Sequence, residues 1–116
     1  MRRVRVVRLR GEFDITSAAA LATALAADAS GPPLTVVDLA AADFIDCATV
    51  HVLQAEARRL KSRGGGLEVA AAHDGVERLL ALVGFRNGSQ VYGTVEQAVA
   101  ALSAARRGSR AASYPD

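Results

Sequence analysis

The sequence is poor in the residues that build disulfides, metal sites and aromatic binding surfaces. Its 116 residues include one cysteine, two histidines, three phenylalanines, two tyrosines and no tryptophan. A single thiol excludes an internal disulfide, and with two histidines it offers too few soft ligands for a structural zinc site. Single-stranded nucleic acids bind by stacking on exposed aromatic rings, so the shortage of rings argues against that ligand. We therefore expect no cofactor and no metal.

Long apolar runs are also absent from the sequence. No stretch approaches the length of a transmembrane helix, and the opening Met-Arg-Arg leads into alternating charges without the apolar region of a signal peptide. We therefore expect a cytoplasmic protein without direct membrane insertion.

The positive charge of the chain is confined to its end. The formal net charge is +2. Residues 1–103 hold 11 Lys+Arg and 11 Asp+Glu, so the excess comes from residues 104–116. A neutral body gives no basic face for nucleic acid. The length fits one domain, which we place at residues 1–103, followed by a flexible basic tail at residues 104–116.

Apolar spacing along the chain alternates between strand and helix periods. The pattern predicts strands at 4–9, 34–39, 67–71 and 90–92, and helices that begin at Thr16 or Ser17, run over 48–63, and follow capping boxes at Asp74/Glu77 and Thr94/Gln97. Gly11 ends the first predicted strand, and the second is expected to be central. This order predicts an α/β fold with a mostly parallel sheet of four to five strands covered by about four helices.

Two acidic loops follow the first two predicted strands, at residues 11–14 and 43–49. In a parallel sheet such loops meet at the carboxyl edge, where binding sites gather. Asp46 directly precedes a helix and can cap it. A phosphate attached two places into that helix would lie in the positive potential of the helix start, while Asp14 and Asp46 would repel it. The residue at that place is Ala48, which has no hydroxyl.

Several ordered stretches, from Val4 to about Leu102, resemble the STAS domain family, specifically the bacterial anti-sigma-factor antagonists. The stretches are Val7–Asp14, Val36–Leu39, Phe44–Asp46, Gly65–Leu67, Val76–Leu80, Val83–Phe85 and Glu96–Ala98. The resemblance implies a single STAS-like domain that binds an anti-sigma factor of kinase fold and so releases a sigma factor for transcription.

In typical members the kinase inactivates the antagonist by phosphorylating a serine in an Asp-Ser-Ser-Gly or Asp-Ser-Thr-Gly segment. The corresponding residues here are Asp46, Cys47, Ala48 and Thr49. Ala48 takes the phosphoacceptor position and cannot be phosphorylated, which implies an antagonist that stays competent to bind or a divergent member with a changed partner. Thr49 is a conceivable substitute acceptor. Together with Asp14, these four residues are the predicted partner-binding site.

Simpler interpretations stand beside these roles. Helix capping alone accounts for Asp46, and Cys47 is more simply a small semi-buried residue than a reactive thiolate. His51 and His73 lack partners for chemistry. No nucleophile, base and orienting acid share a motif, so we do not expect an enzyme.

Other functions remain open from sequence alone. The chain could be a STAS-like accessory subunit of an ABC-type lipid transporter, or a small flavodoxin-like cofactor binder. Family members carry an extra edge strand before the one that ends in Gly-Glu-Phe-Asp, and only Met1–Arg3 precede it here. The exposed edge could pair with another chain, so a homodimer is a further alternative.

Overall fold

The computed structural model describes residues 4–27, 34–84 and 91–112, and helices and strands alternate along them. In chain order the elements are β1 (Val4–Phe13), α1 (Ile15–Ala27), β2 (Leu34–Ile45), α2 (Cys47–Ser62), β3 (Gly66–Ala70), α3 (Asp74–Leu82), β4 (Val91–Tyr92) and α4 (Val95–Ala112). The predicted alternation is confirmed, and the fold is α/β.

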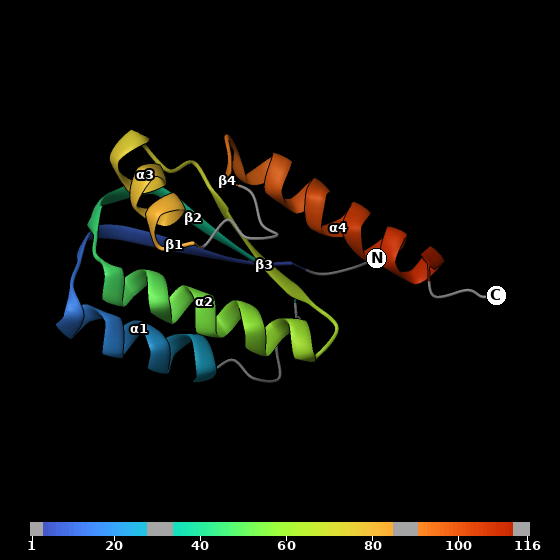
Figure 1. Cartoon of the computed structure of the whole chain (residues 1–116), viewed down its shortest axis with the longest axis horizontal. Coiled ribbons are helices and arrows are strands. Elements are labelled where there is room, and N and C mark those ends of the chain that lie inside the picture. Colours follow the sequence, from blue (N-terminus) through green and yellow to red (C-terminus); the bar gives the residue numbers. More distant parts are fainter. Residues whose placement is uncertain (1–3, 28–33, 85–90, 113–116) are drawn as a thin grey trace.

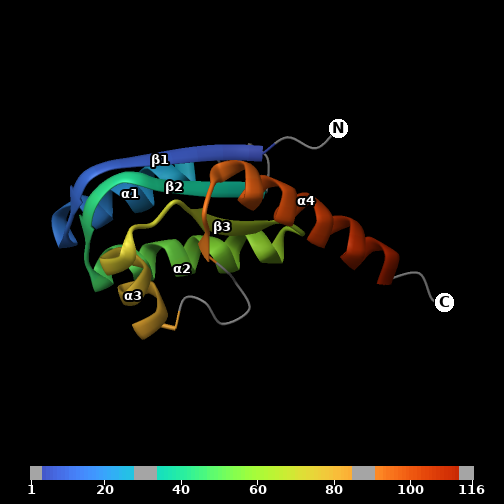
Figure 2. The ribbon, with the colours of Figure 1, turned by 90° about the horizontal axis from the view of Figure 1, so that it is seen from above.

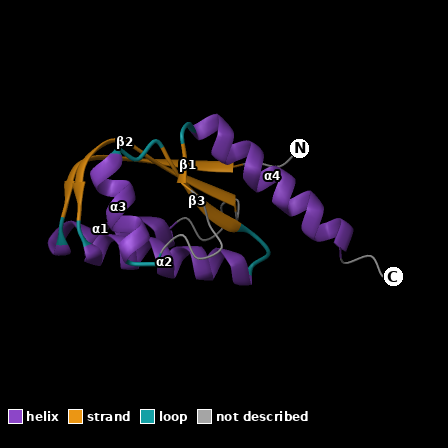
Figure 3. Cartoon of the chain, turned by 45° about the horizontal axis from the view of Figure 1, so that its top comes forward, coloured by secondary structure: helices purple, strands orange, loops and turns teal. Residues whose placement is uncertain are grey.

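The strands form one parallel sheet in the order β1-β2-β3-β4 (Figures 1 and 3). Val36 of β2 pairs with Val6 of β1 on one side and with Glu68 of β3 on the other. The expected central position of the second strand is therefore confirmed, as is the mostly parallel sheet. Among the described residues β1 is an edge strand.

Helices cover the two faces of the sheet unequally. Alternate residues of β2 point to opposite faces, so Val37 and Leu39 join one buried cluster while Leu34 and Val36 join another. The first cluster includes apolar residues of α1, α2 and α3, and the second includes residues of α4. Figure 2 shows α4 over one end of the sheet, away from the carboxyl ends of β1 and β2.

The first two strands are longer than predicted. β1 continues through Gly11 to Phe13, and β2 continues to Ile45. Gly11 adopts a positive φ of 81° inside the strand, and a register shift between Gly11 and Glu12 keeps the two strands paired. The prediction that Gly11 ends the strand is therefore wrong. The expected acidic loops shrink to single residues, Asp14 and Asp46, between strand and helix.

Two of the predicted helix starts are corrected. Helix α1 begins at Ile15 with Asp14 before it, so neither Thr16 nor Ser17 caps it. Asp74 lies inside α3, whose N-cap is His73 without a side-chain cap bond. Asp74 has instead the first-turn position in which a carboxylate favours the helix dipole.

The predicted capping box before the last helix is confirmed. The Gln97 backbone N–H donates to Thr94 Oγ1 at 3.1 Å, and the Thr94 N–H donates to Gln97 Oε1 at 3.3 Å. Helix α4 continues to Ala112 rather than ending near Ser103. Alanine and arginine are strong helix formers, and one internal glycine costs only about 1 kcal/mol. The assignment of residues 104–116 as a flexible tail stays a prediction, and Gln90 and residues 113–116 lie outside the described residues.

Candidate functional site

The two strand-to-helix junctions lie next to each other at the carboxyl edge of the sheet. Phe13, the last residue of β1, pairs with Ile45, the last residue of β2. Asp14 and Asp46 follow these paired residues, so the starts of α1 and α2 are neighbours. Figure 1 shows both junctions at the same end of the molecule, away from α4. The fold thus brings together the two aspartates that the sequence analysis selected.

Asp14 holds the first turn of α1. Its Oδ1 accepts hydrogen bonds from the Thr16 hydroxyl at 2.6 Å and from the backbone N–H groups of Thr16 and Ser17 at 3.0 and 3.2 Å. The Thr16 hydroxyl bond and these backbone bonds lower the pKa of Asp14 below its usual value, against a small opposing effect of burial. Asp14 is exposed, so its carboxylate is both a helix cap and a negative group that a partner can reach.

Asp46 holds the first turn of α2 in the same way. Its Oδ1 accepts from the backbone N–H and from the hydroxyl of Thr49, both at 3.0 Å. Thr49 is fully buried. Phosphorylation of Thr49 would therefore require the first turn of α2 to open, and its role as a substitute acceptor stays a prediction.

Cys47 and Ala48 occupy the surface of the same turn. Cys47 is exposed, so the simpler interpretation of a semi-buried residue is wrong. Ala48 is half-buried, with Asp46 half-buried beside it. Of the five predicted site residues, Asp14 and Cys47 have exposed side chains, Asp46 and Ala48 are half-buried, and Thr49 is buried in the interior.

Sequence reasoning missed two exposed apolar side chains beside these junctions. Ile15 follows Asp14 and is 73% exposed, and Phe44 lies two residues before Asp46 and is 51% exposed. The sequence signal that could have identified them is a large apolar residue next to carboxylates in an acidic segment. We call Asp14, Ile15, Phe44, Asp46, Cys47 and Ala48 together the capping edge.

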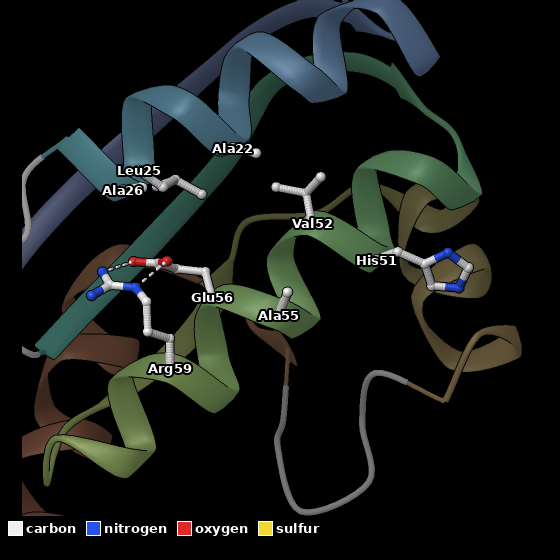
Figure 4. A pocket seen from close by; sticks show the side chains of 8 residues that line it. All are labelled: Ala22, Leu25, Ala26, His51, Val52, Ala55, Glu56 and Arg59. Atoms are coloured by element: carbon white, nitrogen blue, oxygen red, sulfur yellow. Dashed lines mark hydrogen bonds and ion pairs between the residues drawn. The ribbon is translucent and has the colours of Figure 1, made fainter.

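A groove between α1 and α2 is separate from the capping edge. Its volume is about 370 Å³. Its lining is mostly apolar and consists of Ala22, Leu25, Ala26, His51, Val52, Ala55, Glu56 and Arg59. Figure 4 shows Val52 turned toward α1 and the His51 ring turned away from it. The predicted site residues do not line this groove.

One wall of the groove carries a buried charge cluster. Glu56 accepts from Arg5 at 3.0 Å and from two nitrogens of Arg59 at 2.9 and 2.6 Å (Figure 4 shows the Arg59 contact). Burial raises the pKa of Glu56, but the hydrogen bonds and charges of Arg59 and Arg5 outweigh burial and leave the pKa below its usual value. Glu56 is thus a structural link between β1 and α2.

Metal-ligating clusters and membrane-spanning helices are both absent from the described residues. Within 4–27, 34–84 and 91–112, no three His, Cys, Asp or Glu side chains are placed to hold a metal ion. No helix in this part of the chain is long and apolar enough to cross a membrane.

The fold is a parallel α/β domain in which two aspartate-capped helix starts share one edge of the sheet. The chain belongs to the STAS domain family, whose sequence pattern matches residues 2–98. It is 31% identical over 99 residues to the anti-sigma-F factor antagonist RsfA of Mycobacterium tuberculosis, which covers 83% of this chain and 77% of that protein.

Several solved structures share the fold, and two of them illustrate the range of similarity. An anti-sigma factor antagonist from Mycobacterium paratuberculosis has a TM-score of 0.77 at 32% identity, with 86% of each chain covered. A sulfate transporter family protein from Wolinella succinogenes has a TM-score of 0.73 at 20% identity, over 86% of this chain and 84% of that one. The antagonist from Mycobacterium paratuberculosis is thus similar to this chain in sequence as well as in fold.

Proposed function

We propose that this STAS domain is an anti-sigma-factor antagonist. It binds an anti-sigma factor of kinase fold and so releases a sigma factor, which regulates transcription indirectly. The observation that carries the proposal is the sequence similarity to two mycobacterial antagonists, at 31% and 32% identity over more than four fifths of this chain. The domain acts by binding rather than by catalysis, and it acts in the cytoplasm.

The capping edge is the surface that we assign to the partner. Asp14 and Asp46 fix the first turns of α1 and α2 through hydrogen bonds of 2.6 to 3.2 Å, so the side chains between them are held in defined positions. A surface that is ordered before binding loses less conformational entropy on association. Cys47 and Ala48 lie on the outer side of this turn, and the buried Thr49 anchors it from within.

Ala48 makes the antagonist independent of phosphorylation at the usual position. A serine there would carry its hydroxyl on the half-exposed side of the first turn of α2. A phosphate would add a charge of about −1.5 to −2 beside Asp46 and Asp14, which would oppose binding of a partner that recognises this edge as it stands. Alanine removes that control, so the domain binds whether or not the kinase is active.

Binding and mass measurements with the cognate anti-sigma candidates test both halves of the proposal. We expect the wild type to bind with a Kd that ATP does not change, and to gain no phosphate. The Ala48→Ser variant should gain one phosphate with ATP and then bind more weakly. Absence of wild-type binding at micromolar concentration to every cognate candidate would refute the function. Stoichiometric phosphate on the wild type, lost in Thr49→Val, would instead place the switch at Thr49.

The alternative function, an accessory subunit of an ABC-type lipid transporter, has less support. The sulfate transporter family protein from Wolinella succinogenes is 20% identical to this chain, and at that identity the similarity shows the fold alone.

A further inference from the structure

The capping edge exposes two apolar side chains that the proposed function has not yet used. Ile15 is 73% exposed and Phe44 is 51% exposed. Isoleucine and phenylalanine are among the residues most often buried, and apolar side chains surrounded by polar groups often mark interaction sites. Each lies within two residues of a capping aspartate, so the two flank the same pair of junctions.

The arrangement of the layers explains why Phe44 has no cover. Ile45 points into the core between the sheet and α1, α2 and α3, so Phe44 points to the opposite face. Helix α4 covers that face at the start of β2, where Leu34 and Val36 are buried against it. Figure 2 shows that α4 does not reach the carboxyl ends of β1 and β2. Among the described helices, therefore, none covers the part of the sheet where Phe44 lies.

The charges around these side chains are mostly negative. Glu12 pairs in register with Phe44, and Asp43 precedes Phe44; both carboxylates are exposed. Asp14 and Asp46 add two more negative groups. Arg10 is the single cation within residues 9–15 and 41–49, two described segments that form this end of the sheet. Each apolar side chain thus has acidic neighbours: Phe44 pairs with Glu12 and follows Asp43, and Ile15 follows Asp14.

We propose that Ile15 and Phe44 are the apolar anchors of the interface with the anti-sigma factor. This inference rests on the proposed function. The complementary surface of the partner has apolar pockets that receive the two side chains, and lysine or arginine around these pockets faces the four carboxylates. A few buried apolar or aromatic residues usually provide most of the affinity of an interface, while charges at the rim mainly raise the association rate.

Threonine substitutions at matched exposed positions test the anchors. Ile15→Thr and Phe44→Thr should each weaken binding about tenfold or more, since burying either side chain is worth a factor of that order. Leu82→Thr is the control, because Leu82 is 78% exposed but lies at the far end of α3, about 13 Å along that helix from its start. It should bind within about twofold of wild type. Thermal unfolding of all three variants should match wild type.

The outcomes separate this inference from the proposed function. If wild type binds and both anchor variants bind within twofold of it, the anchors are refuted while the function stands. Equal losses in all three variants would also refute the anchors, because the effect would not be specific to this edge. A wild type that binds no cognate anti-sigma factor refutes both. The association rate of wild type should fall as salt rises; a rate independent of salt would refute the basic lining of the partner.

Discussion

Substitutions of Asp46 separate its structural role as a helix cap from its proposed role in binding the partner. The Asp46→Ala variant loses the acceptor for the backbone N–H and the hydroxyl of Thr49, both 3.0 Å away. Loss of an N-cap costs about 1 kcal/mol. The Thr49 hydroxyl is fully buried, so leaving it without an acceptor adds about 1–2 kcal/mol. We expect a loss of about 2–3 kcal/mol, a large share of a stability of roughly 5–15 kcal/mol.

The Asp46→Asn variant keeps the acceptor and removes the charge. Asparagine caps helices about as well as aspartate, so its loss should be under about 1 kcal/mol, from the weaker interaction with the helix dipole. Urea unfolding measures both values, and with a typical slope the alanine variant should unfold about 1–2 M earlier. Adding Thr49→Val to Asp46→Ala should restore part of the loss, because it removes the buried hydroxyl as well as its acceptor.

Equal destabilisation by alanine and asparagine would refute this account, since the charge rather than the oxygen would then hold the turn. The asparagine variant also reports on the partner. It should fold normally and bind more weakly if the carboxylate contacts the anti-sigma factor. Unchanged binding would restrict Asp46 to capping.

Two further substitutions test the structure away from this junction. Glu56→Gln removes the buried carboxylate that Arg5 and Arg59 share, at an expected cost of about 3 kcal/mol. Folding lowers the pKa of Glu56 below 4.5, so its contribution to the free energy of unfolding is complete above that pH and is lost as the pH falls through the lowered pKa. The free energy of unfolding of Glu56→Gln, measured in urea across this range, should lack that part of the decline with falling pH. Gly11→Ala should cost about 1 kcal/mol from the positive φ of 81° alone, since an added Cβ meets nothing within 4 Å, and Gly11→Asn should cost less. Equal costs for alanine and asparagine in thermal unfolding would contradict this reason.

The order of the elements could be predicted because its signals are local. The capping box of Thr94 and Gln97 spans four residues and appears in the structure as the sequence indicates. The strand ends could not be predicted in the same way. Gly11 normally marks the end of a strand, but here pairing with β2 continues past it through a register shift. The end of β1 thus depends on its pairing with β2, and neither strand's own sequence encodes it.

The buried state of Glu56 depends on a partner far away in the chain. Arg5, which donates to it, is 51 positions away, and this contact exists only once β1 and α2 are packed. Helical spacing places Glu56 three residues after Leu53 and four before Leu60, on the buried face of α2, but it does not reveal which cation neutralises the carboxylate. The exposure of Phe44 has a similar origin, because it depends on where α4 ends over the sheet. Both features follow from tertiary packing, which a periodic pattern does not contain.

Asp46 has a structural role as a helix cap besides its place in the family's phosphorylation segment, so its presence alone is weak evidence of regulation. The fold needs a hydrogen-bond acceptor at position 46, since Thr49 is fully buried and donates to it. An aspartate would therefore be favoured whether or not a kinase phosphorylates the first turn of α2. Finding the aspartate of the family segment therefore does not argue that the phosphorylation switch persists. The side chains that report on function are the ones that the fold does not require. In the function that we propose, Ala48 removes the usual switch, and the exposed Ile15 and Phe44, which contribute little to the core, mark where the partner binds.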